Sequence, residues 1–342
     1  TLRHSSAASD VYKRQVPEIY EAFAATRGLA EDKNLIKLQE QLGEDYEIPN
    51  HRKICRPFGE NIGMILGESA QFIVLMQDSL ALELGLNIHG AALSSHIHSD
   101  GYKKSISGPG AGNYLTVGKI FNEIKKHFSS DALNKTFFHA HGTSTPQNRE
   151  SESHIISSIS KAFGIEALPV TAIKSYLGHS LAAAGGDQMI SILGSWKNNL
   201  IPGITSTPEL AKNVHKENVE FLLQNKKIED GEFDFAVLNA KGFGGNNGTS
   251  LVSSPSKTMQ MLKSKYSKKD IDAYLVKRSK IDDQLDETKQ EILKGDITSR
   301  YIFGEDVIDG MSDFDIQIDK ITNKSTKEVF DLNSTLPYKD YL

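Results

Sequence analysis

The strongest constraint on the fold comes from two histidines, each of which follows a short strand-like run. His141 follows the run 136–140 and opens the segment His-Gly-Thr-Ser-Thr-Pro, whereas His179 follows the run 169–173 and closes the segment Lys-Ser-Tyr-Leu-Gly-His. Turn residues and then a helical pattern come after each histidine. Proteins that alternate strands and helices bind their ligands in loops at the strand ends. We therefore expect both imidazoles on such loops of an α/β sheet.

A third loop, Gly242–Asn247, lies between the strand-like runs Phe233–Asn239 and Thr249–Ser253. It lacks the glycine spacing of dinucleotide-binding and Walker loops, and a strand rather than a helix follows it. Its glycines instead favour a close approach of the backbone to a ligand. Together the three loops predict one active site.

The rest of the pattern also alternates between strands and helices. Helical spacing is found in 16–42, 78–84, 114–128, 150–163 and 181–196, strand-like runs are 70–76 and 88–93, and 99–113 is a loop. The run 70–76 is apolar almost throughout, which is typical of a strand covered on both faces. This alternation predicts parallel or mixed sheets with helices on both faces.

Composition excludes several classes of function. The formal net charge is −5 over 342 residues, which does not favour general binding of nucleic acid or of an anionic membrane surface. No apolar run reaches the length of a membrane-spanning helix. The single cysteine rules out an internal disulfide and suits a reducing compartment. We therefore expect a cytoplasmic protein that neither spans a membrane nor binds nucleic acid.

The two ends of the chain differ from its middle. Thr1–Gln15 shows neither helical nor strand periodicity and is interpreted as a non-native leader. After Pro255 the segment Lys257–Lys280 is basic with helical spacing, and 287–342 mixes acidic and apolar residues. We expect 255–342 to be a charged extension that packs partly on the body.

Histidine and cysteine side chains also have simpler roles, as core residues, surface residues or metal ligands. A lone histidine is most often an ordinary core or surface residue, but two loop histidines at strand ends favour a site. The pairs His96-x-His98 and His139-x-His141 could each present two imidazoles on one strand face. No Asp, Glu or Cys completes a ligand set nearby, so no metal site is expected. Cys55 is flanked by basic residues, yet Pro57 makes it a poor nucleophile, and we interpret it as structural.

The motifs, taken in order, resemble the β-ketoacyl synthases of the thiolase fold over residues 16–254. They are Arg56-Pro57-Phe58, Gly67-Glu68, His141–Pro146 with Glu152, Lys174 with Gly178-His179, and Gly242–Asn247. Within that family, the segments 67–71, 147–149 and 242–247 and the charged extension resemble an atypical initiating group first described in pseudomonads and vibrios. The sequence differs from the family where Arg149 replaces a common Asp, and where Ser69 and Gln71 replace glycines.

The resemblance implies a five-layered α/β/α/β/α fold, in which 16–85 ends the N-terminal half and 86–254 forms the C-terminal half. It also implies a decarboxylating Claisen condensation of malonyl-carrier protein with an acyl thioester. His141 and His179 would then be the catalytic donors, with Lys174 beside them. In supporting roles, Glu152 would form an ion pair with Lys174, and Thr143 and Thr145 would line the site. Phe243, flanked by Gly242 and Gly244, would gate the acyl pocket.

The family's nucleophilic cysteine lies upstream of the matched segment, and Cys55 stands at the wrong place in the motif order. The chain is therefore expected to be a C-terminal portion without condensing activity of its own. The implied partners are acyl carrier protein, acyl-CoA and a second copy in a homodimer, and no cofactor is implied. The alternative is a polyketide or polyunsaturated-fatty-acid ketosynthase, or its non-catalytic chain-length partner subunit.

Overall fold

Six strands form one mixed sheet, whose order across the sheet is β3-β10-β9-β4-β5-β7. The strands are β3 (Ala91–Ser99), β4 (Thr136–His139), β5 (Leu168–Thr171), β7 (Val219–Phe221), β9 (Phe235–Gly242) and β10 (Asn246–Ser253). β4 pairs in parallel with β5 and β9, and β5 pairs in parallel with β7. β10 runs antiparallel to both β9 and β3. The carboxyl ends of β4 and β5 therefore meet at one edge of the sheet.

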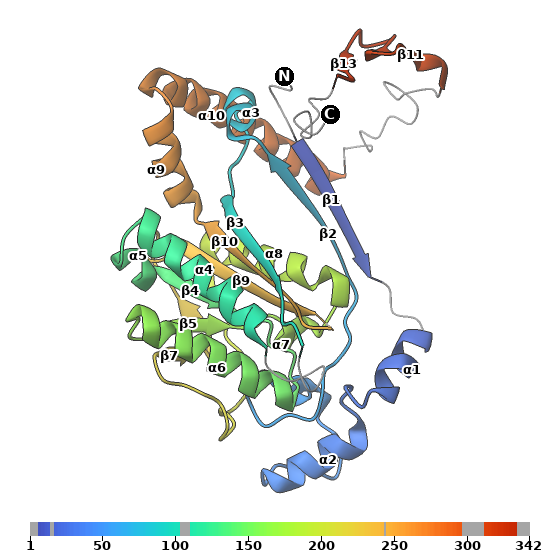
Figure 1. Cartoon of the computed structure of the whole chain (residues 1–342), viewed down its shortest axis with the longest axis vertical. Helices are drawn as coiled ribbons and strands as arrows, with labels where there is room; N and C mark the ends of the chain where they lie inside the picture. Colours follow the sequence, from blue (N-terminus) through green and yellow to red (C-terminus); the bar gives the residue numbers. More distant parts are fainter. Residues whose placement is uncertain (1–5, 14–16, 103–109, 243, 296–310, 334–342) are drawn as a thin grey trace, which may run out of the picture. The chain divides into compact units, whose positions relative to one another are not determined.

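Helices cover both faces of this sheet (Figure 1). One face packs against α4 (Ala111–His127) and α6 (Pro146–Phe163), and Phe138 of β4 points into that core. The other face packs against α8 (Ala184–Lys197), and the adjacent Phe137 points into that second core. Because side chains alternate along a strand, an uninterrupted apolar run serves both cores.

A computed structural model describes residues 6–13, 17–102, 110–242, 244–295 and 311–333. The chain divides into two units, residues 1–281 and 282–342. The first unit also contains α5 (Asp131–Asn134), α7 (Lys174–Leu177), the 3-10 turns η1 (His51–Lys53) and η2 (Leu181–Ala183), and the paired short strands β6 (Leu200–Ile201) and β8 (Lys226–Lys227). The second unit contains η3 (Met311–Asp313) and an antiparallel sheet of β11 (Phe314–Ile316), β12 (Lys320–Asn323) and β13 (Val329–Asp331).

The expectation of a continuous helix over 16–42 is wrong. The structure has two helices, α1 (Pro17–Ala25) and α2 (Asp32–Gln41). Between them the Gly28 carbonyl accepts from the Met64 N–H at 2.9 Å, and the Ala30 N–H donates to the Met64 carbonyl at 3.0 Å. This pairing requires extended backbone, so it interrupts the helical pattern.

The start of the chain forms a strand, although its sequence shows no strand periodicity. β1 (Ser6–Lys13) pairs antiparallel with the whole length of β2 (Ser69–Met76). The interpretation of 1–15 as a non-native leader stays a prediction. β2 itself is not covered on both faces as expected, because Phe72, Val74 and Leu75 are 73%, 65% and 54% exposed.

The extension packs on the body as expected, at least through residue 281. α9 (Pro255–Lys265) and the start of α10 (Lys268–Lys294) share a small apolar core with α3 (Asp78–Leu84). The Tyr274 hydroxyl donates to the Leu86 carbonyl at 3.0 Å, and Lys277 Nζ donates to the Glu83 carbonyl at 2.6 Å. Lys277 thus satisfies a carbonyl in the last turn of α3, which the helix itself leaves without a partner, and Tyr274 holds the chain just beyond that helix. The boundary at 255 stays a prediction.

The exposed apolar side chains of β2 predict self-association of the isolated chain. Replacing Phe72 and Val74 with Ser should raise its soluble fraction, because both side chains lie on one exposed strand face. Ile48→Ser is the matched control, since Ile48 is 77% exposed but lies outside any strand. Sedimentation of the expressed chain measures the effect. An equal rise in soluble fraction for Ile48→Ser and for the double variant would contradict this prediction.

Candidate active site

His141 lies on the loop that leaves β4, and a buried carboxylate holds its backbone. Glu152 of α6 accepts the His141 N–H at 2.7 Å and the Gly142 N–H at 2.9 Å. Gly142 has φ +50°, and a β-carbon there would lie 2.6 Å from that of Ala172. Glycine is therefore required for the sharp turn that aims the loop back over the sheet.

The next residues of this loop join it to α6 and to the segment before β2. Ser144 has φ +61°, which is uncommon for a residue with a β-carbon, and its hydroxyl accepts from the Arg56 N–H at 2.7 Å. Thr145 caps α6 by accepting from the Asn148 N–H, and its hydroxyl lies 3.1 Å from that of Thr143. The two threonine hydroxyls are therefore held together on the loop that carries His141, and their supporting role stays a prediction.

His179 reaches the same place from the end of β5. The segment 174–177 is a single helical turn, α7, and Gly178 at φ +70° follows it. The Leu181 N–H donates to His179 Nδ1 at 3.1 Å. A nitrogen that accepts cannot carry the proton of a neutral imidazole. In neutral His179 the proton is therefore on Nε2, which is a hydrogen-bond donor.

The structure brings the two imidazoles together, with ring centroids 5.2 Å apart and planes at 85°. Both side chains are buried. Burial, with the nearby Lys174 charge, lowers the pKa of His179 to about 3 and the pKa of His141 well below its usual 6.5. Both rings are therefore neutral at neutral pH, and they act as dipolar donors rather than as cations.

Lys174 is the buried cation of the site. Burial lowers its pKa to about 8, and the Glu152 carboxylate opposes that shift. The resemblance implies an ion pair between these two residues, but Nζ of Lys174 has no hydrogen-bond partner among the described residues. Glu152 instead accepts two backbone N–H groups and the side-chain amides of Asn148 and Asn239, each at 2.8 Å. The two charges thus interact through space rather than by direct contact.

Cys55 lies against this site, yet its thiol is unreactive. Its Sγ donates to the Lys174 carbonyl at 3.0 Å, and burial raises its pKa to about 12. A thiol is nucleophilic only as the thiolate. The geometry therefore agrees with a structural role for Cys55.

The loop 242–247 is shorter than the sequence indicates. β9 and β10 extend to Gly242 and Asn246, so the connection is a hairpin with Gly244 and Gly245 at φ +81° and +83°. Asn247 donates to the Gly245 carbonyl and to the Asp100 carboxylate, which fixes the turn. Phe243 lies outside the described residues, and its gating role stays a prediction.

Sequence reasoning missed the amides that position the site. Gln188 of α8 donates from Nε2 to the carbonyls of His139, Ala140 and Asn239. Gln188 therefore ties the carboxyl end of β4 to β9 just before His141. The available signal was a pair of polar residues, Asp187 and Gln188, directly after a run of small residues.

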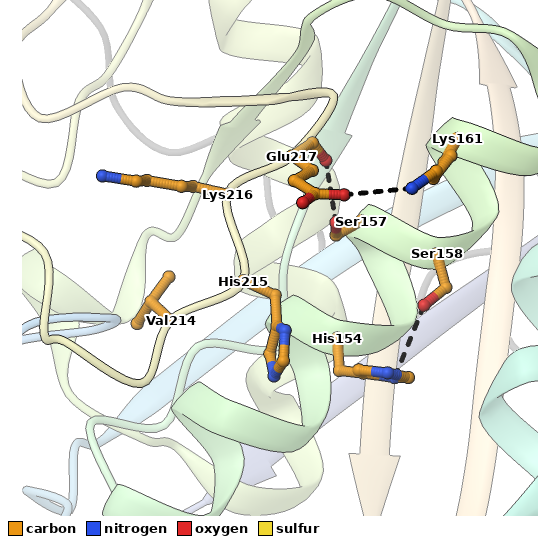
Figure 2. Close-up of a pocket in the computed structure, with 8 residues that line it drawn as sticks. All are labelled: His154, Ser157, Ser158, Lys161, Val214, His215, Lys216 and Glu217. Carbon is orange, nitrogen blue, oxygen red and sulfur yellow. Dashed lines mark hydrogen bonds and ion pairs between the residues drawn. The ribbon is translucent and has the colours of Figure 1, made fainter.

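A separate surface hollow of about 400 Å³ lies between α6 and the segment 214–217 (Figure 2). It contains an edge-to-face pair of exposed histidines, His154 and His215, with ring centroids 4.7 Å apart. Lys161 beside it is paired with Glu217 at 3.2 Å. We place the candidate site at His141 and His179 because there the polar groups converge in a buried space.

Within the described ranges, no three Asp, Glu, His or Cys side chains gather as metal ligands. His96 instead contacts Glu123 at 2.6 Å, and His98 contacts Lys119 at 2.7 Å. No helix in the described part of the chain has both the length and the apolar character needed to cross a bilayer.

The buried histidines predict a loss of stability in acid. The pKa values of His139 and His179 are each lowered to about 3, and that of His141 is lowered too, chiefly by burial. Between pH 6.5 and 3 the unfolded chain takes up protons that the folded chain does not, so stability falls as pH falls. Each histidine contributes a slope of about 1.4 kcal/mol per pH unit.

Thermal or urea unfolding at successive pH values measures this slope. His179→Asn should make it shallower, whereas His154→Asn, a change at an exposed site, should leave it unchanged. Identical slopes in the wild type and in His179→Asn would contradict this prediction.

Known proteins with similar sequences are consistent with this geometry. Residues 90–207 match the family model described as the β-ketoacyl synthase C-terminal domain. The β-ketoacyl-[acyl-carrier-protein] synthase FabY of Pseudomonas aeruginosa is 41% identical over 86% of this chain and 46% of its own length. The 3-oxoacyl-[acyl-carrier-protein] synthase 2 of Staphylococcus aureus is 28% identical over 56% of this chain and 45% of its own length.

Solved structures agree in fold. The crystal structure of the noncanonical ketosynthase FabY from P. aeruginosa superposes with a TM-score of 0.88 at 37% identity, covering 98% of this chain and 52% of that one. A ketosynthase of the Bacillus subtilis bacillaene synthase gives 0.60 at 19% identity, over 73% of this chain and 42% of that one. The chain spans about half the length of the relatives that it matches. The expected mixed α/β, thiolase-like fold is confirmed, and the chain belongs to the β-ketoacyl synthase family.

Proposed function

We propose that the protein containing this chain is a 3-oxoacyl-[acyl-carrier-protein] synthase of fatty acid biosynthesis. An enzyme thiolate first attacks an acyl thioester, so that a new thioester forms on the enzyme and the donor leaves as the free thiol of CoA or of the carrier protein. Malonyl-carrier protein then loses CO₂, and the electron pair of the broken bond forms an enolate whose carbon attacks the acyl-enzyme carbonyl. The products are a 3-oxoacyl-carrier protein, CO₂ and the free enzyme thiol, which recovers a proton.

One observation carries this proposal, namely two buried neutral imidazoles 5.2 Å apart, one of which has its proton on Nε2. Decarboxylation places negative charge on the thioester oxygen. Preorganised donors in a buried space stabilise such charge, and removing one donor of this kind costs about 3–4 kcal/mol. A neutral imidazole can make this hydrogen bond without bringing a charge of its own.

Lys174 supplies the positive charge in this proposal. Its pKa of about 8 keeps it largely protonated at neutral pH, and its charge helps to keep both histidines neutral. A cation without a hydrogen-bond partner in a buried site favours the developing enolate. Thr143 and Thr145 would line the approach of the substrate, and Phe243 with its flanking glycines Gly242 and Gly244 would gate the acyl pocket.

The nucleophile in this proposal is not Cys55. The buried thiol has a pKa of about 12 and its Sγ donates to a carbonyl, so it would not form a thioester near neutral pH. Since Cys55 is the sole cysteine of the chain, the acylated thiol must belong to another part of the complete protein. The chain by itself would therefore not complete a condensation.

Acyl carrier protein and acyl-CoA are the proposed thioester substrates, and a second copy is the proposed dimer partner. A related type II ketosynthase structure contains an acyl-carrier protein bound to its ketosynthase. Carrier-protein thioesters would place the enzyme in the cytoplasm, which agrees with the single cysteine.

Decarboxylation tests this function most directly. In the complete protein, His179→Ala should lower kcat for CO₂ release from malonyl-carrier protein about 100- to 1,000-fold, because one donor to the enolate is lost. His154→Ala removes a histidine from the surface hollow of Figure 2 and should leave kcat unchanged. A wild type that releases no CO₂, or a His179→Ala variant of normal rate, would refute the proposal.

Basic residues of the extension are proposed to meet the acidic carrier protein. Lys265 and Lys277 already contact α3, whereas Lys263, Lys268 and Lys269 are exposed. Charge reversal of these three lysines to Glu should lower kcat/KM for malonyl-carrier protein at least about tenfold at low salt, through a slower association rate.

The rate of acyl transfer from acyl-CoA should not change, because acyl-CoA has no acidic helix to meet these lysines. Charge reversal of Lys125 and Lys126, in the last turn of α4, is the matched control. An equal loss of kcat/KM for malonyl-carrier protein in both sets of variants would count against docking on the extension.

A further inference from the structure

The segment 65–71 holds the His179 loop at two separate points. The first is a backbone contact, in which the His179 N–H donates to the Ile65 carbonyl at 2.6 Å and the Gly67 N–H donates to the His179 carbonyl at 3.1 Å. The second is made by side chains, and Asp187 lies at its centre.

Asp187 is a buried carboxylate in the first turn of α8. Its Oδ2 accepts from the Ser180 hydroxyl at 2.5 Å, and its Oδ1 accepts from the Ser69 hydroxyl at 2.5 Å. Gln71 also donates from Nε2 to Oδ1. Both oxygens therefore have donors, from β2 on one side and from the residue after His179 on the other, so the carboxylate links the two segments.

The donors from β2 are the side chains of Ser69 and Gln71, which reach across to the first turn of α8. Gly186 of α8 makes room for the glutamine, since a β-carbon there would lie 2.5 Å from Oε1 of Gln71. Ser69, Gln71 and Asp187 thus form one hydrogen-bonded unit between β2 and α8.

This unit lies next to the turn that orients His179. Leu181 has φ +55°, a left-handed conformation that is unfavourable for a residue with a β-carbon. The same turn aims the Leu181 N–H at His179 Nδ1. Because Ser180 lies between these two residues, its bond to Asp187 holds the strained turn in place.

We propose that Asp187, held by Ser69 and Gln71, is a positioning residue for His179 that fixes the ring's orientation and its Nε2–H form. This inference rests on the proposed function, in which that proton faces the thioester oxygen. An error of about 1 Å in such a donor can cost a factor of 100 in rate.

Asp187 also acts on Lys174 through its charge. Burial lowers the pKa of Lys174, and the carboxylates of Glu152 and Asp187 oppose that shift. The neighbouring imidazoles of His139, His141 and His179 are neutral. Removing the Asp187 charge therefore lowers the Lys174 pKa, so the fall in activity on the alkaline side should begin at a lower pH.

The test uses the complete protein and the variants Asp187→Asn and Gly186→Ala. Asp187→Asn should lower kcat for malonyl-carrier-protein decarboxylation about 10- to 100-fold with little change in KM. It should also shift the alkaline limb of the pH–activity profile to lower pH. Gly186→Ala displaces Gln71 but keeps the carboxylate charge, so kcat should fall while the alkaline limb stays in place. Should Asp187→Asn fail to fold, Gly186→Ala and Ser69→Gly still test the positioning.

A purely structural role predicts a lower melting temperature with unchanged kcat and pH profile per folded molecule, and that result would overturn the proposal. Nitrogen NMR of ¹⁵N-histidine-labelled protein gives a readout that does not depend on activity. The His179 ring, assigned by its loss in His179→Ala, should show the Nε2–H form in the wild type and a mixture in Asp187→Asn.

The NMR result also separates this proposal from the proposed function. A tautomer change in a protein whose wild type lacks decarboxylase activity would refute the function and support the positioning. An unchanged tautomer in an active enzyme would refute the positioning alone.

Discussion

The site depends on one buried carboxylate whose hydrogen-bonding capacity is filled by neutral donors. Glu152 accepts two backbone N–H groups at the His141 turn and two amides from other elements. These four hydrogen bonds fix the backbone of the His141 loop, while the Glu152 charge acts on Lys174 through space. If that charge were lost, the Lys174 ammonium group would be buried with less electrostatic compensation.

The site combines a buried cation with neutral imidazoles, and burial explains this combination. An imidazolium would have to be buried beside the Lys174 charge, so the histidines remain neutral. Neutral rings can still donate, provided that something fixes which nitrogen holds the proton. At His179 that constraint comes from a backbone N–H on a left-handed leucine. The strain at Leu181 and at Ser144 is thus located where the chemistry needs fixed geometry.

Much of this arrangement could be predicted from local pattern. The strand ends before His141 and His179, the helix 78–84 and the mixed sheet all follow from apolar runs broken by turn residues. The pattern failed where contacts between distant residues decide the structure. The pairing of residues 28–30 with Met64 interrupts a helical run, and a hairpin register shortens the loop at 242–247. Asp187 was missed for a similar reason, because its partners Ser69 and Gln71 are more than 110 residues away.

The contacts that α10 makes at the end of α3 have a consequence for how the chain folds during synthesis. Tyr274 and the carbonyl of Leu86 are 188 residues apart in sequence, and Lys277 and Glu83 are 194 apart. Until residues 259–278 have left the ribosome, Leu82 of α3 therefore lacks Leu262, Ile271 and Tyr274 as packing partners. Closing a loop of this length carries an entropic cost that local contacts do not. Truncation before residue 259 would leave Leu82 and the Glu83 carbonyl without these partners and open this part of the chain to chaperones and proteases.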